Sequence, residues 1–183
     1  MKYEKTVLLK DGRTCVLRNA EAKDAQAALD LFLATHAQTD FLGSYPDESK
    51  LTVESEAEYL QRQTDSDNGI ELLAEIDGTV AGMAGISCFS PKYKMRHRAM
   101  FGIGVDRNYW GLGAGRALTA ACIECAKAAG YAQLELSVVA ENTRAIALYE
   151  SFGFREYGRN PRGFRSRVSG WQPLVEMLLE IDA

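Results

Sequence analysis

The chain has 183 residues, 46% hydrophobic and 25% charged, with a formal net charge of −4. This balance is that of an ordinary globular protein and argues against disorder, collagen-like structure and a disulfide-stapled miniprotein. A duplex-binding domain usually carries a basic excess, so the composition argues against nucleic acid as the partner.

The first half of the chain alternates hairpins with amphipathic helices. Periodicity predicts strands over 6–10 and 13–18, helices over 24–36 and 53–64, and strands over 70–76 and 79–87. The dipeptide Asp11-Gly12 between the first two strands predicts a type I′ turn. A loop is expected over 39–50, and Thr52 is placed to cap the second helix.

The second half reads as strand–helix–strand units. We expect a strand over 97–105, a helix over 113–129, a strand over 133–139, a helix over 142–151, a strand starting at 154–158, and a last strand over 174–181. An arginine-rich loop would join the last two strands. No linker or repeat divides the chain, so the order predicts one mixed α/β domain over 1–183, with a partly antiparallel and partly parallel sheet.

Cysteine usage and hydropathy bear on the compartment. Cys122 and Cys125 form a C-x-x-C within an alanine-rich helical segment, but no second Cys/His pair stands at metal spacing. We therefore expect half-buried thiols and no metal. No apolar run approaches the roughly 20 residues that span a bilayer, and no apolar stretch of a signal peptide follows the first residues. We expect a cytoplasmic protein that does not bind membranes.

The sharpest motif is a glycine-rich turn, Trp110-Gly-Leu-Gly-Ala-Gly115, between a predicted strand and a predicted helix. A helix start presents free N–H groups and the positive end of the helix dipole. Glycines remove β-carbons, so a ligand can approach the backbone closely. The turn therefore predicts an anion site, best suited to phosphate.

Three phosphate or structural interpretations compete for this turn. A Walker A loop needs Lys-Ser or Lys-Thr after its glycines, which this chain lacks. A dinucleotide-binding fingerprint needs Gly or Ala at its sixth position, where Arg116 or Leu118 stands here. A turn whose glycines only serve packing stays open as the third interpretation.

The turn resembles the pyrophosphate-binding turn of the GNAT superfamily of acyl-CoA-dependent N-acetyltransferases, Arg/Gln-x-x-Gly-x-Gly/Ala. Gly113 and Gly115 occupy the two small positions, whereas Trp110 departs from the Arg/Gln position. A branch similar to the ribosomal-protein N-terminal acetyltransferases carries Tyr-Trp-Gly at this place. A second segment resembles the family's next motif, and its matching residues are Val138, Asn142, Ala145, Tyr149, Gly153 and Phe154.

The resemblance implies a GNAT-like fold, with a central mixed sheet of six to seven strands and about four flanking helices. A V-shaped splay would separate the parallel strands 97–105 and 133–139, and acetyl-CoA, as cosubstrate, would lie in it. The cofactor-binding residues carried over are Ile103, Gly104, Val105, Trp110, Gly111, Leu112, Gly113, Ala114, Gly115, Arg116, Asn142 and Tyr149. The alternative interpretation of Arg116 is a solvated arginine on the helix surface. The alternative for Asn142 is an N-cap of its helix.

The implied chemistry is direct attack of an amine on the thioester. Tyr149 matches the family's general acid, although a packed helix tyrosine is its structural alternative. Many members place a catalytic Glu on the strand before the turn, but Met100 stands at one plausible register here. His97 is the candidate base, since the pKa of histidine suits neutral pH. Glu71, Glu75 or a water chain are the alternatives.

Two charged regions bear on the acceptor. Residues 40–71 are strongly acidic. This stretch would either attract a cationic amine or form a solvated acidic helix. Three aromatic residues of this stretch would either line an acceptor pocket or pack among the first two helices and their loop, namely Phe41, Tyr45 and Tyr59. A patch of opposite charge near the end of the chain would bind an acidic substrate group or a partner subunit. It consists of Arg155, Arg159, Arg162, Arg165 and Arg167.

The sequence thus predicts an acetyl-CoA-dependent N-acetyltransferase acting on a primary amine of a small molecule, peptide or protein. The alternative is a non-catalytic acyl-CoA-binding sensor or interaction module, which Met100 favours and Tyr149 opposes. Dimers are common in the family, so a homodimer is compatible with this interpretation.

Overall fold

The computed structural model describes residues 1–181 and holds eight strands in one sheet, in the order β1-β2-β3-β4-β5-β6-β8-β7. The strands are β1 (Glu4–Leu8), β2 (Thr14–Asn19), β3 (Ile70–Ile76), β4 (Thr79–Cys88), β5 (Arg98–Val105), β6 (Gln133–Val139), β7 (Arg155–Ser166) and β8 (Gly170–Glu180). The α-helices are α1 (Ala25–Gln38), α2 (Val53–Asp65), α3 (Ala114–Ala128) and α4 (Thr143–Glu150). This mixed α/β fold confirms the predicted class. The sheet has the eight strands that the sequence pattern predicts segment by segment, against the six to seven that the family resemblance implied.

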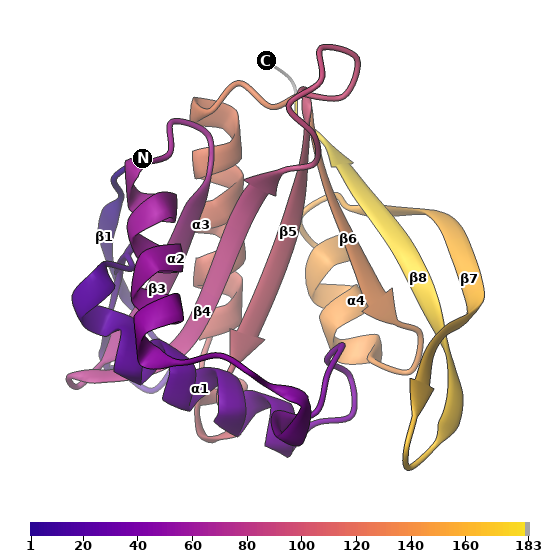
Figure 1. Ribbon diagram of the computed structural model, residues 1–183, viewed down its shortest axis with the longest axis horizontal. Helices are drawn as coiled ribbons and strands as arrows, with labels where there is room; N and C mark the ends of the chain where they lie inside the picture. Colours follow the sequence, from indigo (N-terminus) through magenta and orange to yellow (C-terminus); the bar gives the residue numbers. More distant parts are fainter. Residues whose placement is uncertain (182–183) are drawn as a thin grey trace.

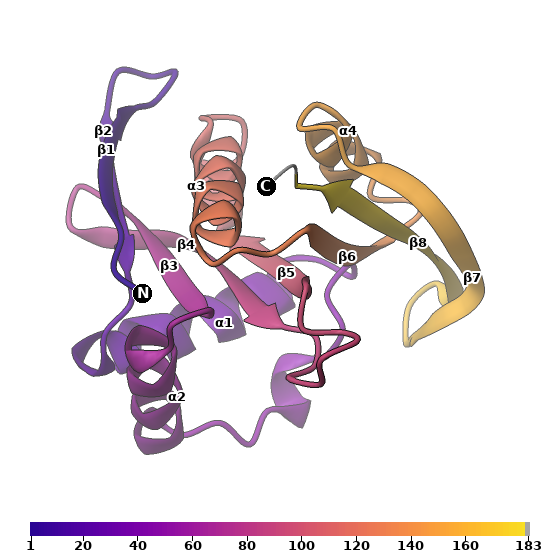
Figure 2. The same ribbon diagram turned by 90° about the horizontal axis from the view of Figure 1, so that it is seen from above.

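Helices cover both faces of the sheet (Figures 1 and 2). The pair α1 and α2 lies on one face, and α3 and α4 lie on the other. Strand β3 shows how alternation serves both layers, because Leu72 and Ala74 pack in the main core with α3, while Leu73 packs with Leu60 of α2. Every second residue of the central strands therefore faces the α1–α2 layer.

The two Asp-Gly turns differ, and the prediction for the first one was wrong. At Asp77-Gly78 both residues have positive φ, 52° and 76°, as a type I′ turn requires. At Asp11-Gly12 only Gly12 does, with φ 85°, and the Leu9 N–H donates to the Arg13 carbonyl over 2.8 Å. The first hairpin therefore has a longer loop that closes on one left-handed glycine.

The prediction of an arginine-rich loop after residue 158 was wrong. This segment continues β7 to Ser166 as the edge strand, paired antiparallel with β8. Two register shifts, between Glu156 and Gly158 and between Asn160 and Phe164, bend it. The polar composition suits an edge strand, since charged side chains protect an open edge from further pairing.

The only parallel neighbours in the sheet separate along their length. Strands β5 and β6 pair at Arg98–Gln133, Ala99–Leu134 and Met100–Glu135 and nowhere beyond. From Phe101 to Val105, β5 keeps its partner β4 but has no partner on its other side. This opening is the predicted V-shaped splay, and it leaves unpaired backbone groups along β5.

Arg98 and Glu135 close the narrow end of the splay. The guanidinium donates from Nε and Nη2 to the two carboxylate oxygens over 2.5 and 2.6 Å. The Glu135 side chain is only 4% exposed, and its bond to Arg98 lowers the pKa of the carboxyl. Within residues 1–181 no helix is both long and apolar enough to cross a membrane.

All four cysteines are free thiols. Cys122 and Cys125 of α3 are buried in the main core, and burial raises the pKa of both. The C-x-x-C thus consists of core thiols, more deeply buried than the half-buried pair expected from the sequence.

Candidate active site

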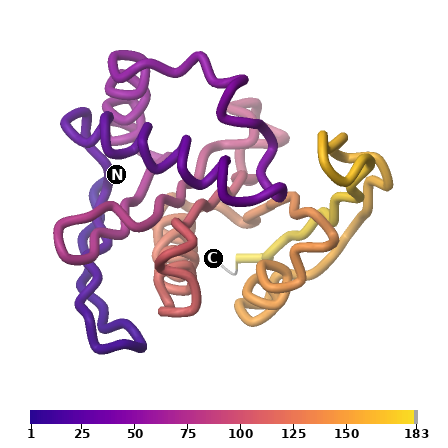
Figure 3. The backbone as a smooth tube through the Cα atoms, turned by 90° about the horizontal axis from the view of Figure 1, so that it is seen from below, coloured from indigo at the N-terminus to yellow at the C-terminus, as the bar shows by residue number. Residues whose placement is uncertain are grey.

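A cavity of about 630 Å³ occupies the splay. It is bounded by the free part of β5, the glycine turn, the start of α4, and the end of α1 with the loop after it. The view from below shows α1 and α4 on opposite sides of the central strands (Figure 3). The predicted residues that line it are Ile103, Gly104, Val105, Trp110, Gly111, Gly113, Gly115, Arg116, Asn142 and Tyr149.

The glycine turn takes its shape from backbone conformations that only glycine adopts freely. Gly111 and Gly113 have φ of 84° and 108°. The first backbone bond of α3 runs from the Ala117 N–H to the Gly113 carbonyl, so the N–H groups of residues 114–116 precede it. Helix α4 also starts at this cavity, which places two positive helix ends beside one space.

Two predicted residues of the turn do not line the cavity with their side chains. Ala114 is fully buried in the main core, and Leu112 packs against that core. The Leu112 carbonyl instead accepts a hydrogen bond from the Lys10 N–H over 3.0 Å. Only the backbone of these two residues is available to a ligand.

Trp110 has a role that the family pattern does not supply. Its indole N–H donates to the Val105 carbonyl over 2.7 Å, tying the turn to the end of β5. The guanidinium groups of Arg107 and Arg144 stack on its ring at 5.5 and 5.1 Å from the centroid. Trp110 thereby holds Arg144 at the turn, close to Gly111.

Sequence reasoning missed Arg144 and Lys10 as cationic groups of this cavity, which both line. Arg144 stands two residues after Asn142, inside the recognised motif, so its position was the available signal. Lys10 lies in the first hairpin, and only the fold brings it here. Both charges suit a polyphosphate ligand.

Arg116 and Asn142 combine the two roles that the sequence left open. Arg116 lines the cavity, but it also donates to Ser151 Oγ over 2.8 Å and stacks on Phe152. Asn142 lines the cavity while its side chain caps α4 by accepting from the Ala145 N–H over 3.3 Å.

Tyr149 lies at the inner part of the same cavity. The residue is 7% exposed, and its ring packs edge-on against Phe101 with 6.0 Å between centroids. Burial raises the pKa of Tyr149 to about 12, so its hydroxyl stays protonated at neutral pH. A protonated hydroxyl at this place can donate a proton or a hydrogen bond.

A second cavity, of about 310 Å³, adjoins the first along β5. Gly102 lines the smaller cavity and its neighbour Ile103 the larger one. The residues that line the smaller cavity are Tyr59, Glu71, Gly85, Ile86, Ser87, Met100, Phe101 and Gly102. Glu71 is the only carboxylate among them.

Glu71 belongs to β3, and its carboxylate accepts a hydrogen bond from the Tyr59 hydroxyl of α2 over 3.1 Å. Desolvation raises the pKa of Glu71 to about 7, with a smaller contribution from Glu56, while the bond from Tyr59 works against the shift. A carboxyl with this pKa can exchange a proton near neutral pH, as a general base requires.

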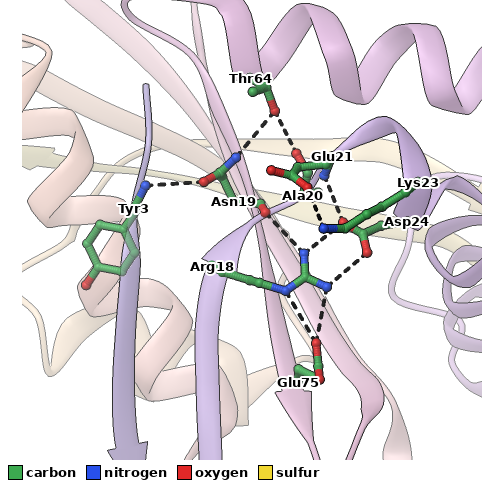
Figure 4. Close-up of polar contacts among 9 residues, drawn as sticks. All are labelled: Tyr3, Arg18, Asn19, Ala20, Glu21, Lys23, Asp24, Thr64 and Glu75. Carbon is green, nitrogen blue, oxygen red and sulfur yellow. Dashed lines mark hydrogen bonds and ion pairs between the residues drawn. The ribbon is translucent and has the colours of Figure 1, made fainter.

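The other base candidates lie elsewhere. His97 is exposed in the turn before β5 and lines neither cavity, so its predicted role gains no support from its position. Glu75 is bound by Arg18 over 3.1 Å, within a network that also holds Asp24 (Figure 4). Met100 lines the smaller cavity, and Glu71 supplies a carboxylate there from another strand.

The acidic and arginine-rich regions meet instead of forming two free surfaces. Arg167 pairs with Asp47 over 2.8 Å and with Glu48 over 3.4 Å. Asp40 accepts hydrogen bonds from Ser166 and from three other side chains of the loop and the β7–β8 hairpin. These contacts fix the loop that carries Phe41 over the larger cavity.

Two of the remaining arginines are also paired, Arg155 with Glu180 and Arg159 with Glu156. Arg162 and Arg165 both stack on the exposed ring of Trp171. Of the predicted aromatics, Tyr59 lines the smaller cavity, whereas Tyr45 packs under Arg167 and donates to Asp40.

Comparisons with known proteins agree with this geometry. The chain is 31% identical to the L-amino acid N-acetyltransferase AaaT of Escherichia coli K12, over 78% of its own length and 84% of that protein. It is 49% identical to the [ribosomal protein bS18]-alanine N-acetyltransferase of the same strain, over 45% of its length. The match spans 55% of that second relative, about half its length.

A solved structure shows the same fold. The crystal structure of an acetyltransferase of the GNAT family from Streptococcus pneumoniae superposes with a TM-score of 0.86, at 31% identity, over 92% of this chain and 99% of that one. Residues 32–154 match the profile of the Acetyltransferase (GNAT) family, a span that includes the splay, the glycine turn and Tyr149. The chain therefore belongs to the acetyltransferase (GNAT) family.

Proposed function

We propose that this protein transfers an acetyl group from acetyl-CoA to a primary amine. The observation that carries the proposal is the junction of two cavities on β5, one with two helix N-termini and one with a desolvated carboxylate on a half-buried residue. The first suits a polyphosphate and the second an amine, and Tyr149 lies in the first, packed on Phe101 of the second.

The larger cavity fits acetyl-CoA by its chemistry. Backbone N–H groups of residues 111–116, with Arg144 and Lys10, would hold the pyrophosphate. The free edge of β5, at Ile103 and Val105, would bond the pantetheine arm as a neighbouring strand would. When bound, acetyl-CoA supplies the acetyl group as an activated thioester.

Two groups of the chain would serve the reaction. Glu71 would accept the proton of the ammonium form, either directly or through water, and leave a neutral amine. The amine would then attack the carbonyl carbon from the side of the smaller cavity. As the carbon–sulfur bond breaks, Tyr149 would donate its proton to the departing sulfur, since its raised pKa keeps it protonated beforehand, and the amine nitrogen would pass its second proton to water or back to Tyr149 to leave the amide.

The acceptor class follows from the relatives and the pocket together. AaaT is by its name an L-amino acid acetyltransferase, and the ribosomal-protein enzyme acts on an alanine. Both names describe transfer to the nitrogen of an amino acid. We propose an α-amino group of an amino acid or peptide as the acceptor of this chain too.

The test is a thiol-release assay with acetyl-CoA against the twenty L-amino acids, a peptide beginning with alanine, and n-butylamine. We expect turnover on at least one α-amine and a strong loss of it in Tyr149→Phe. Tight acetyl-CoA binding without turnover on any amine would contradict the enzyme and support the acyl-CoA-binding module instead.

A further inference from the structure

Three residues on neighbouring strands stand in one row on the α1–α2 face of the sheet. Glu71 of β3 is paired with Gly85 of β4, and Gly85 is paired with Gly102 of β5. Among the registered pairs of the described strands β4 and β5, only Gly85–Gly102 has no side chain on either strand. The row runs from Glu71 to the free edge of β5.

The Glu71 carboxylate lies over Gly85. A β-carbon at Gly85 would overlap Glu71 Oε2 and lie 2.9 Å from the carboxyl carbon. At Gly102 a β-carbon would meet no atom within 4 Å, so that position is open space in the smaller cavity. Neither glycine has a positive φ, so backbone conformation does not require glycine at either place.

We infer that Gly85 is a positioning residue for the Glu71 carboxylate, and that Gly102 keeps the path between that carboxylate and the acetyl-CoA cavity clear for the amine. The inference rests on the proposed function. Strand β4 lies between β3 and β5, and neighbouring strands lie roughly 4.8 Å apart. A glutamate on β3 therefore cannot reach the free edge of β5 if a side chain on β4 stands between them. The absent side chain on β4 lets the carboxylate cross that distance.

A β-carbon at Gly85 would also lie 3.0 Å from the Ile70 carbonyl oxygen, but its two shorter contacts are both with the Glu71 carboxylate. Tyr59 and Glu56 of α2 are the titratable groups that face Glu71. Cys122 of α3 lies on the opposite face of the sheet, in the main core. The lining residues of β4 and β5 add no titratable group.

The first experiment follows the carboxyl itself, by carbon-13 NMR titration of glutamate-labelled protein, with Glu71→Gln to assign the signal. In Gly85→Ala the methyl displaces the carboxylate toward water. We expect the titration midpoint of Glu71 to fall by more than one pH unit. An unchanged midpoint in folded Gly85→Ala would overturn the inference, whether or not the wild type turns over any amine.

The second experiment is kinetic, with acetyl-CoA and the best amine of the panel above. We expect Gly85→Ala to lower kcat at least tenfold and to shift the rising limb of the pH profile. Gly102→Ala should instead raise the KM of the amine and leave that limb in place. Gly158→Ala, a strand glycine of β7 with only ordinary contacts, is the matched control and should keep wild-type kinetics.

A double variant separates displacement from damage to the fold. Asp is one methylene shorter than Glu, so Gly85→Ala should cost much less in a Glu71→Asp background than in the wild type. Full additivity of the two changes would contradict the inference. If the wild type turns over no amine, the proposed function fails alone, because the NMR titration still decides whether Gly85 positions Glu71.

Discussion

The two cavities that meet on β5 are built in opposite ways. The larger one is cationic, and its attraction for anions comes from backbone N–H groups, two helix ends and the side chains of Lys10 and Arg144. The smaller one has a single carboxylate, Glu71, whose pKa is raised by desolvation. A binding site made from backbone is encoded by one short segment, whereas a tuned carboxyl needs neighbours from several elements.

If this division is correct, changes in the smaller cavity should alter chemistry and leave acetyl-CoA affinity intact. Glu71→Gln should lower kcat/KM by about 100- to 10,000-fold, since that is the usual contribution of a general base. The dissociation constant of acetyl-CoA, measured by calorimetry, should not change. A parallel loss of acetyl-CoA affinity would contradict the division.

The same variant has a pH signature in kinetics and in stability. Wild-type activity should rise as pH passes through about 7, because Glu71 must lose its proton to act. The pKa of Glu71 is higher in the folded protein than in the unfolded chain, so the protein loses stability as the pH rises through the folded-state pKa. Glu71→Gln should therefore raise the Tm more at pH 8 than at pH 5, and an equal change at both would contradict a buried carboxylate.

Tyr149 tests the junction between the cavities. Tyr149→Phe should lower kcat by about 100-fold, because the departing sulfur loses its proton donor. The packing on Phe101 is kept, so the Tm should change little. Phe152→Leu, which alters a neighbouring core-facing aromatic, is the control and should retain most of kcat.

Changes in the glycine turn should have the reverse effect, on binding before chemistry. Gly113→Ala places a β-carbon at φ 108° and should weaken acetyl-CoA binding by about tenfold through strain in the turn. Gly130→Ala is the matched control, since Gly130 also has positive φ but follows α3 away from both cavities. Equal affinities in the two variants would contradict the role of the turn.

A further prediction concerns the stability of the closed end of the splay. Arg98→Met leaves the buried Glu135 without its partner and should cost about 3 kcal/mol of the free energy of unfolding. Denaturant titration measures it. Arg155→Met removes an exposed pair with Glu180 and should leave the unfolding midpoint nearly unchanged. Similar losses in both variants would show that burial does not govern the Arg98 pair.

Local signals were sufficient for much of the fold. Apolar periodicity placed the four helices and most strands, because amphipathic patterns follow directly from burial of one face. The turn at 110–115 predicted its cavity for the same reason, since glycine conformations and helix ends are local properties. Failures arose where a distant partner decides the structure, as in β7, whose polar residues become a strand by pairing with β8.

The choice of a candidate base shows the same limit at the level of one side chain. His97 looked suitable by its chemistry, but it lies in an exposed turn outside both cavities. Glu71 and Glu75 look alike in the sequence, four residues apart on one strand. Arg18 neutralises Glu75, while Tyr59, Glu56 and the bare backbone of Gly85 surround Glu71.

The sequence by itself thus determined the family, the order of elements and the place of the glycine turn, because each is carried by residues close together in the chain. The tertiary structure alone decided which carboxylate is desolvated and which cations join the turn. Those properties depend on groups from α2, β3, β4 and the first hairpin, which only packing brings together.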